Sequence, residues 1–360
     1  MNAVKKLLTL TLPTLVLLFV AGELIFRFVL PAAESPTVAF DAADGILKYD
    51  VTGRRSGIYT IGPFVEAKAR WRINNDGWNS EIDYTSAHGA VPRIAIIGDS
   101  YVEAMQVDVD KSFGALLRRA FAGRAEVYTI GIAGAPLSEY LQLARYAARR
   151  FHPDVFVINV VHNDFDESIR TLVPRPEFLQ FEPAGNSVRE APPLGYTPSR
   201  MRRLLRRSAV FRWLLQNAQL YALPTRLAAI RDRKTMIANT DLGKILANRT
   251  VIELAVREVA RKLRAENPNA RIVFMIDGAR SDIYNGTAAT SPVRMLAEMV
   301  RRAAEAAHCD FLDLTPAFAA EWARSHREFN FRYNFHWNEE GHRVAAAALA
   351  RTLNSETAPR

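Results

Sequence analysis

The sequence contains a single cysteine, Cys309, among its 360 residues. One cysteine excludes an intrachain disulfide, and no Cys-x-x-Cys pair or other zinc-ligand spacing is present. The formal net charge of +9 suits acidic partners or anionic surfaces, but the chain has no recognisable nucleic-acid-binding module. We therefore expect no structural zinc site and no nucleic-acid partner.

Long hydrophobic runs are also scarce, with one exception at the N-terminus. Lys5 and Lys6 precede an apolar run from residue 7 to residue 30, which Pro13, Glu23 and Arg27 interrupt. About 20 apolar residues span a bilayer, and flanking lysines stay on the cytoplasmic side. Residues 1–30 are therefore predicted to anchor the chain in the inner (cytoplasmic) membrane as a single pass, with the remainder on the periplasmic or extracytoplasmic side.

A cleaved signal peptide is the alternative interpretation of the same run. Its apolar core would be shorter, and Ala32-Ala33 is only a weak cleavage site. Glu23 and Arg27 lie four residues apart and would share one face of a helix, where they can pair. The uncleaved anchor is the interpretation we favour.

Residues 31–90 show little periodicity and are predicted to form a linker and a strap over the main domain. "ESPTVAFDAADG" (34–45) is typical of a linker. Short strand-like stretches surround the turn residues 74–77, Asn-Asn-Asp-Gly.

Short apolar runs then alternate with helical patterns. The runs cover residues 94–97, 127–132, 155–161, 272–276 and 311–314. Helices are predicted at 111–121, 137–151, 251–270 and 293–307, and from Asn338 to the end of the domain, with Asp110 and Asn338 as the caps of the first and the last. This alternation predicts an α/β fold with a parallel sheet of about five strands, covered on both faces. Such sheets carry their sites at the carboxyl ends of the strands.

Residues 167–261 interrupt the alternation and form a basic, mainly helical insert. Between Arg200 and Thr235 the chain has nine arginines and one lysine against one acid, Asp232. An apolar stripe consists of Met201, Leu204, Leu205, Phe211 and Leu215. The helix could lie on an anionic membrane surface, line a cleft for an acidic glycan, or pack its stripe on the core.

Polar residues follow the predicted strands. The first strand ends at Gly98-Asp99-Ser100, which would expose the Ser100 hydroxyl at the sheet edge. A serine nucleophile needs a base, and His336 lies in the loop before the last helix. His162 follows the third strand and could line the site, whereas His342 lies inside the helix and is interpreted as structural.

Acyl transfer also needs hydrogen-bond donors for the developing oxyanion. Gly134 follows the second strand, and Asn163 follows the third. With the backbone N–H of Ser100 they would supply three donors. Taken singly, Gly134 is equally a turn glycine and Asn163 a turn cap; the order of Ser, Gly, Asn and His after successive strands favours a site.

Gly98-Asp99-Ser100, Gly134, Asn163 and His336 resemble the four motif blocks of the SGNH hydrolases, also called the GDSL family. The resemblance covers about residues 91–165 and 265–357, so that 91–357 would be the hydrolase domain. It implies a flavodoxin-like three-layer α/β/α sandwich and ester hydrolysis or acyl transfer through an acyl-serine, with no metal or organic cofactor. The stretch "INNDGWNSE" and the Glu and Arg of the apolar run resemble membrane-anchored bacterial members.

One departure from that family concerns the residue that orients the histidine. The family usually has an aspartate two or three residues before it, where this chain has Asn334 and Tyr333. Asparagine can accept a hydrogen bond from Nδ1–H but brings no charge, and in a serine protease Asp to Asn costs ~10⁴ in turnover. Asn334 or a backbone carbonyl could orient the ring, Asp277 could replace the acid, or the site could be weak. Thr129 stands where relatives often have asparagine and is interpreted as structural.

The functional prediction is a serine esterase or O-acyltransferase with an acylated small molecule or polysaccharide, such as an envelope glycan, as substrate. The alternative is a catalytically degenerate member that binds glycan or protein partners at the membrane. A lipase-type α/β-hydrolase is disfavoured because no Gly-x-Ser-x-Gly elbow is present.

Overall fold

A five-stranded parallel sheet forms the centre of the computed structural model, which describes residues 7–220, 236–237, 240–332 and 334–355. Its strand order is β13-β12-β7-β5-β6. The strands are β5 (Arg93–Gly98), β6 (Glu126–Gly131), β7 (Val155–Val160), β12 (Arg271–Ile276) and β13 (Asp310–Asp313). The five predicted strands and their parallel pairing are confirmed.

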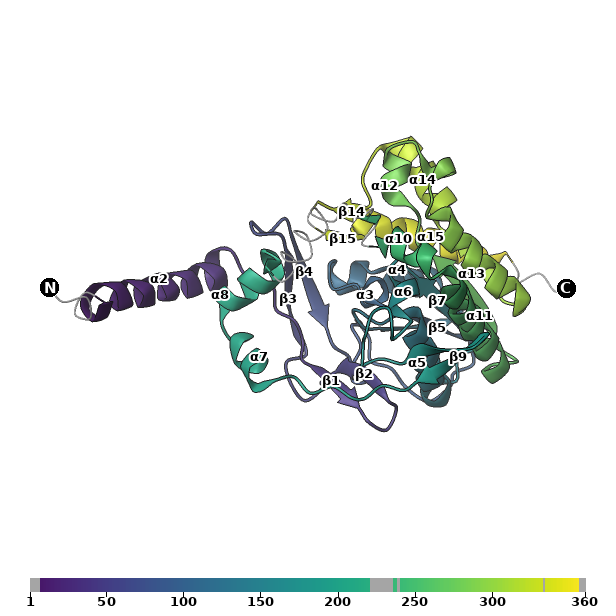
Figure 1. Ribbon diagram of the computed structural model, residues 1–360, viewed down its shortest axis with the longest axis horizontal. Coiled ribbons are helices and arrows are strands. Elements are labelled where there is room, and N and C mark those ends of the chain that lie inside the picture. Colours follow the sequence, from purple (N-terminus) through teal and green to yellow (C-terminus); the bar gives the residue numbers. More distant parts are fainter. Residues whose placement is uncertain (1–6, 221–235, 238–239, 333, 356–360) are drawn as a thin grey trace.

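Helices cover both faces of this sheet (Figure 1). Strand β5 shows why, because Ala95 and Ile97 belong to one buried apolar cluster and Ile94 and Ile96 to the other. The first cluster contains residues of α5 (Leu137–Phe151), α11 (Arg249–Glu266) and α13 (Arg294–Ala306). The second contains residues of α4 (Phe113–Ala120), α12 (Arg280–Tyr284), α14 (Thr315–Ser325) and α15 (Glu339–Asn354). The fold is therefore a three-layer α/β/α sandwich, as predicted.

The helix caps agree with the sequence at one end and differ at the other. Asn338 caps α15, since its Oδ1 accepts from the backbone N–H of Gly341 at 3.0 Å. Helix α4 is capped by Ser112, whose Oγ accepts from Ala115 N at 3.3 Å, and not by Asp110. The cap shifts because Asp110 lies within a 3₁₀ turn, Val109–Lys111.

Residues 31–90 form two hairpins, β1 (Val38–Asp41) with β2 (Ile46–Tyr49) and β3 (Ser56–Ile61) with β4 (Ala67–Arg72). Strand β1 lies in the stretch that we expected to be a linker. The segment that follows the hairpins is tied to the sheet, because the Tyr84 hydroxyl accepts from Thr129 N at 2.8 Å and donates to Thr129 O at 3.0 Å. Thr129 thus has the structural contacts that were expected of it.

Ahead of α11, which begins within the predicted bounds of the insert, the insert is built from short elements. They are the hairpin β8 (Gln180–Ala184) and β9 (Ser187–Ala191), α7 (Arg200–Leu205), α8 (Ala209–Arg212), a π-helical turn (Trp213–Asn217), the hairpin β10 (Met236–Ile237) and β11 (Thr240–Asp241), and α10 (Leu242–Ala247). The prediction of a single basic helix here is wrong. The helix is interrupted after α7, and Ser208 caps α8 by accepting from Phe211 N at 3.3 Å. Met201 and Leu204 are 62% and 60% exposed, so that part of the stripe does not pack on the core. Residues 221–235 of the basic stretch lie outside the described residues.

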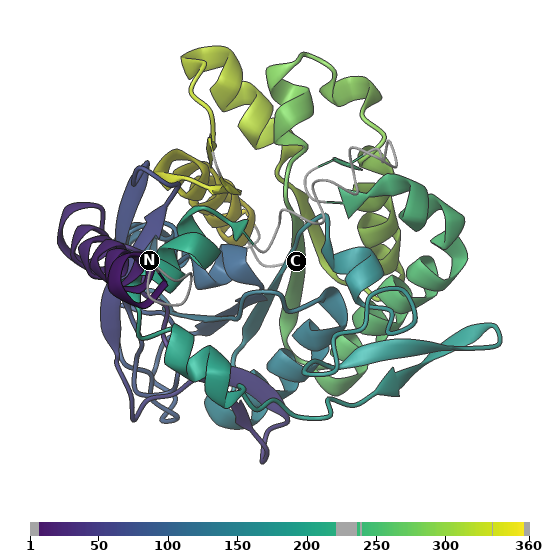
Figure 2. The ribbon, with the colours of Figure 1, turned by 60° about the vertical axis from the view of Figure 1, so that its left-hand side comes forward.

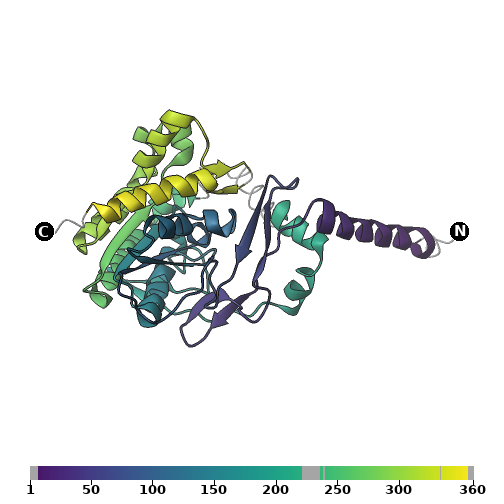
Figure 3. The same ribbon diagram turned by 180° about the vertical axis from the view of Figure 1, so that it is seen from behind.

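The N-terminal apolar residues form one helix that projects from the body (Figures 1, 2 and 3). It comprises a π-helical turn (Leu7–Thr11), α2 (Leu12–Leu24) and a second π-helical turn (Ile25–Val29). Thr9–Val29 is 21 residues long and apolar enough to cross a membrane, as a single anchor or a signal sequence would be. The expected pair forms, with Arg27 Nη2 3.1 Å from Glu23 Oε2. Lys5 and Lys6 lie outside the described residues.

Candidate active site

The first strand of the sheet ends in a tight turn that carries Ser100. Gly98 fits there because a Cβ would lie 2.5 Å from Val102 Cγ2 and 3.1 Å from Asn159 O. Asp99 then caps the short helix α3 (Ser100–Glu103), with its Oδ1 accepting from Tyr101 N at 3.0 Å. The hydroxyl of Ser100 is thereby placed at the carboxyl end of β5, where parallel sheets carry their sites.

A distant hairpin brings His336 to this turn. Strands β14 (Asn330–Phe331) and β15 (Asn334–Trp337) pair just before α15, and His336 Nε2 lies 2.6 Å from Ser100 Oγ. The hairpin is held beside α3 because the Tyr101 hydroxyl donates to Phe335 O at 3.0 Å. The serine and the histidine that the sequence singled out are therefore in hydrogen-bond contact.

Asn334 orients the imidazole from the other side. Its Oδ1 accepts from the backbone N–H of His336 at 2.9 Å and also contacts Nδ1 of the same residue. A backbone N–H can only donate, so the amide oxygen, and not its NH₂ group, must face this side. The facing Nδ1 must then carry the ring proton, which leaves Nε2 free to accept from Ser100. Tyr333, the other position considered for an acid, lies outside the described residues.

The environment keeps this imidazole neutral. Burial, together with the positive charge of Arg280, lowers the pKa of His336 to about 3. A carboxylate at position 334 would oppose this shift, but the asparagine carries no charge. The ring is thus neutral, with Nε2 as an acceptor, over the pH range in which most proteins are stable.

Asp277 forms hydrogen bonds with residues other than His336 and does not replace the missing aspartate. Its Oδ1 accepts from Trp337 Nε1 at 2.9 Å and its Oδ2 from Arg280 Nη2 at 3.0 Å. Within the described part of the chain no hydrogen bond joins Asp277 to His336. Arg280 Nη2 also donates to the Tyr101 hydroxyl at 2.7 Å, so Asp277 belongs to a buried network next to the imidazole.

The other two histidines considered in the sequence analysis, His162 and His342, differ in their surroundings. His162 follows β7 and is 4% exposed, and burial lowers its pKa while the charge of Asp277 opposes that effect. His342 lies inside α15, where its Nδ1 accepts from Phe113 N at 3.2 Å, as expected for a structural residue.

The two predicted oxyanion donors lie at the ends of the neighbouring strands. Gly134 follows β6 with φ +82°, a conformation that favours glycine. Asn163 precedes α6 (Asp164–Glu167), and its Nδ2 donates to Glu167 Oε2 at 3.3 Å. Glu167 also pairs with Arg175 at 3.0 Å, and Arg175 Nη1 is 3.8 Å from where a Cβ would sit at Gly134. One ion pair therefore links the surroundings of both donors.

Sequence reasoning missed that ion pair and a second buried carboxyl, Glu103, at the end of the short helix that begins at Ser100. Glu167 follows Asn163 by four residues, a helical spacing that could have indicated the contact, whereas Arg175 lies in a proline-rich loop without periodicity. Glu103 Oε1 accepts from Ala133 N at 2.9 Å and from the Tyr49 hydroxyl. Burial raises the pKa of Glu103 to about 7.

Asp99 has a similarly shifted acidity. Burial raises its pKa to about 7, against the hydrogen bond from Tyr101 N. Its Oδ2 lies 3.1 Å from Ser100 Oγ, further than the imidazole nitrogen. The serine proton is therefore better placed for His336 than for Asp99.

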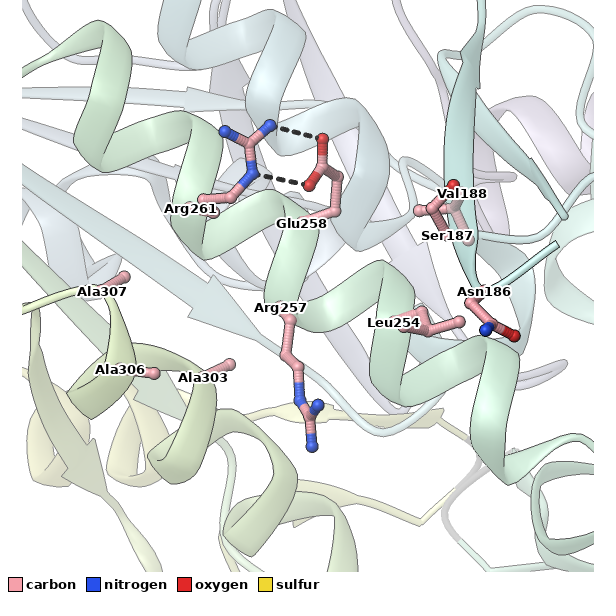
Figure 4. Close-up of a pocket in the computed structure, with 10 residues that line it drawn as sticks. All are labelled: Asn186, Ser187, Val188, Leu254, Arg257, Glu258, Arg261, Ala303, Ala306 and Ala307. Carbon is pink, nitrogen blue, oxygen red and sulfur yellow. Dashed lines mark hydrogen bonds and ion pairs between the residues drawn. The ribbon is translucent and has the colours of Figure 1, made fainter. Parts of the chain in front are cut away.

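Two further features bear on ligands. No cluster of three or more His, Cys, Asp or Glu side chains among the described residues is arranged to hold a metal ion. A pocket of about 380 Å³ lies between α11, α13 and the β8–β9 turn, where Glu258 pairs with Arg261 (Figure 4). None of the residues around Ser100 lines it, so it is separate from the site described above.

Comparison with known proteins identifies the family. The GDSL-like lipase/acylhydrolase family matches residues 96–344. No curated protein matches the chain. Similar solved structures include an alpha/beta hydrolase enzyme from the metagenome of Lake Arreo, Spain, at 16% identity over 73% of this chain and 94% of that chain (TM-score 0.40).

Two other similar structures come from named bacteria. A catalytic mutant of an acetylxylan esterase from Geobacillus stearothermophilus is 14% identical over 74% of this chain and 96% of that one (TM-score 0.39). The lipase/acylhydrolase from Enterococcus faecalis is 12% identical over 75% and 99% (TM-score 0.39). Since the family match spans most of the sandwich, from β5 to α15, this chain belongs to the GDSL-like lipase/acylhydrolase (SGNH) family of ester hydrolases.

Proposed function

We propose that this protein is a membrane-anchored serine esterase that cleaves O-acyl groups of envelope glycans through an acyl-serine intermediate. The contact of 2.6 Å between His336 Nε2 and Ser100 Oγ carries the proposal. It is supported by the Asn334 amide, which fixes the tautomer in which Nε2 can accept a proton.

In the first half of the reaction, Ser100 Oγ attacks the ester carbonyl carbon while its proton passes to His336 Nε2. The carbonyl π electrons move to oxygen, and the resulting oxyanion is bound by the backbone N–H groups of Ser100 and Gly134 and by Asn163 Nδ2. When the tetrahedral intermediate collapses, the C–O bond to the alcohol breaks. The leaving oxygen takes the proton from His336.

In the second half, an acceptor hydroxyl attacks the acyl-serine. His336 removes the proton of the acceptor and returns it to Ser100 Oγ as the acyl–serine bond breaks. With water as acceptor the product is a carboxylic acid, and with a sugar hydroxyl it is a new ester. The same residues therefore serve hydrolysis and O-acyl transfer.

The position of the site relative to the apolar helix supports a membrane-proximal substrate. The β3–β4 turn accepts a hydrogen bond from Arg332 N through Glu66 Oε1 at 2.7 Å, which ties it to the hairpin of His336. The same turn accepts from Trp213 Nε1 through Pro63 O at 3.0 Å, and Trp213 stacks on Phe26 of the apolar helix. Phe335, half-exposed beside the histidine, offers a flat apolar face to a sugar ring.

Covalent labelling tests this proposal. A fluorophosphonate probe should label the wild-type protein at Ser100, and a short-chain aryl ester should be hydrolysed. Ser100→Ala should abolish both, whereas Ser281→Ala, which alters an exposed serine of α12, should abolish neither. Turnover that survives in Ser100→Ala would refute the assignment of the nucleophile.

The alternative function, a degenerate member that binds glycan or protein partners, is favoured by the uncharged residue at position 334. Absence of probe labelling in the folded wild-type protein would favour it. A panel of acylated glycans, assayed with and without sugar acceptors on wild-type and Ser100→Ala proteins, would identify the acyl group. The same panel would separate hydrolysis from transfer.

A further inference from the structure

The end of the apolar helix is built into the basic insert. Glu23 accepts hydrogen bonds from Ala209 N at 3.0 Å and Val210 N at 3.2 Å, and also from the Ser208 hydroxyl. It therefore binds the free backbone N–H groups at the start of α8. Phe26 stacks on Trp213 with ring centroids 4.3 Å apart. Glu23, a charged residue within the apolar run, thus connects the apolar helix to the domain.

The chain after the helix is equally well packed. Ala32 and Ala33 are 2% and 0% exposed, and Ala33 N donates to Asn217 Oδ1 at 3.0 Å. Asn217 Nδ2 in turn donates to the Thr60 hydroxyl at 3.0 Å. The segment after the helix, Ala32-Ala33, is therefore packed into the folded domain.

A cavity of about 320 Å³ lies at this junction. Its lining is strongly cationic, with four arginines, Arg27, Arg54, Arg207 and Arg212, against one carboxylate, Glu34. The remaining lining residues are Phe26, Pro31, Ala32 and Ile58. The volume is at the lower end of the range for small-molecule sites, about 300–1,000 Å³.

The arginines retain unused donors. Arg54 pairs with Glu34, and Arg27 pairs with Glu23 behind the cavity. Arg207 has no side-chain hydrogen bond or ion pair within the described ranges, and Arg212 Nε is buried without a partner there. Four guanidinium groups therefore line this cavity with a single carboxylate, and an anion bound there would accept charge-assisted hydrogen bonds from arginines such as Arg207.

The cavity lies where the apolar helix would leave the bilayer. The 21-residue apolar segment ends at Val29, and lining residues flank that end in the sequence and in the insert. Phe64, Met201 and Leu204, on the turn and the helix next to this junction, are 79%, 62% and 60% exposed. Arginines beside exposed apolar side chains are typical of a surface that lies in the interface of an anionic membrane.

We propose that this cavity binds the phosphate group of an anionic phospholipid from the membrane that holds the apolar helix. The proposal rests on the anchor in the function proposed above, but not on the chemistry at Ser100. Arg207 and Arg212 donate to the phosphate oxygens, and the glycerol and acyl chains follow the apolar helix. The bound lipid then fixes the height of the domain above the bilayer.

Lipid retention by the full-length protein tests this proposal. The protein is purified in detergent and mixed with phosphatidylglycerol or with phosphatidylcholine of the same acyl chains, and bound lipid is measured by native mass spectrometry. Wild type should retain phosphatidylglycerol preferentially. Arg207→Gln and Arg212→Gln should each weaken retention about tenfold, as expected for a lost charge-assisted hydrogen bond. Arg257→Gln, at an exposed arginine of α11, is the matched control and should leave it unchanged.

The outcomes separate the possible sources of the anion. Equal retention of both lipids by wild type, or undiminished preference in both arginine variants, would overturn the proposal. Retention of inorganic phosphate by wild type, lost in Arg207→Gln and Arg212→Gln, together with no preference for phosphatidylglycerol, would assign the cavity to free phosphate and overturn the lipid source. Hydrolysis of a soluble aryl ester should be unchanged in Arg207→Gln, so failure here is distinguishable from failure of the esterase assignment.

Discussion

His336 Nε2 lies 2.6 Å from Ser100 Oγ, although the two residues are 236 positions apart in the chain. The contact depends on Asn334, whose amide oxygen binds both the backbone N–H of His336 and the ring Nδ1. In the serine protease in which Asp to Asn was so costly, the asparagine selected the wrong tautomer. Here the backbone N–H fixes the amide, so the tautomer is correct and only the charge is missing.

Asn334→Asp should therefore increase turnover and shift its pH dependence. A carboxylate beside Nδ1 favours the imidazolium, so it raises the pKa of His336 from about 3 and moves the acid limb of kcat/KM to higher pH. The gain in kcat should be about tenfold to a hundredfold, below the ~10⁴ of the protease because the tautomer is already set. The measurement is a pH–rate profile with an aryl ester.

Asn334→Leu is the control for the orienting role, because it removes the acceptor without adding charge. Its kcat should fall, since neither nitrogen of the ring is then selected for the proton. If Asn334→Asp left the acid limb in place, or Asn334→Leu turned over substrate like wild type, Asn334 would not orient the imidazole.

The sheet was predictable from the sequence because its strands are short, β-branched and buried on both faces. Residues 155–161, for example, contain four valines and one isoleucine and gave β7 within one residue. The structure of the insert was not predictable, because local spacing cannot show that Glu23, far away in the chain, binds the start of α8. That contact lies at the start of α8, where the basic stretch is interrupted, and it depends on tertiary structure.

The site was predictable to the extent that its residues follow strands. Ser100 and His336 were identified from their positions, and the structure brings them together. The residues around them, Arg280 and Glu167, were not identified, since they act through contacts between separate elements. Asp277 was considered as a substitute acid, but Trp337 and Arg280 occupy its oxygens.

Glu167→Ala should lower kcat with little change in KM. Glu167 holds the amide of Asn163, so its loss leaves that donor free to turn away from the oxyanion. The effect should be about tenfold, below the 10²–10³ expected for removing an oxyanion donor outright. The double variant with Asn163→Ala should be no slower than Asn163→Ala alone. Additive losses in this cycle would show that Glu167 acts by another route.

Glu103→Gln should change how stability depends on pH. Burial raises the pKa of Glu103 from 4.5 to about 7, so the folded protein binds a proton more tightly than the unfolded chain. That contribution is complete below about pH 4.5 and is lost as pH rises towards 7. The variant cannot ionise, so its deficit against wild type at pH 5 should shrink by pH 8. Calorimetric Tm values measure this.

The control is Glu328→Gln, at an exposed glutamate, which should give a Tm difference from wild type that does not change with pH. At pH 5, Glu103→Gln should be destabilised by about 1–3 kcal/mol, because its NH₂ group replaces an acceptor in a buried site. Parallel Tm curves for Glu103→Gln and wild type between pH 5 and pH 8 would contradict the shifted pKa.

Gly131→Ala should displace the turn that carries Ser100. A Cβ on this last residue of β6 would lie 2.7 Å from Glu103 N and 2.9 Å from Asp99 O, so the turn that carries Ser100 must move. Overpacking of this kind costs about 1–3 kcal/mol, and a shift of about 1 Å at a reacting group can cost about 10² in turnover. The Tm and the aryl ester turnover should both fall.

Gly89→Ala is the matched control, because its Cβ would meet only Glu126 Oε1, at 3.6 Å, and it should behave like wild type. Wild-type turnover in Gly131→Ala would mean that the turn tolerates displacement and that the 2.6 Å contact does not limit the reaction.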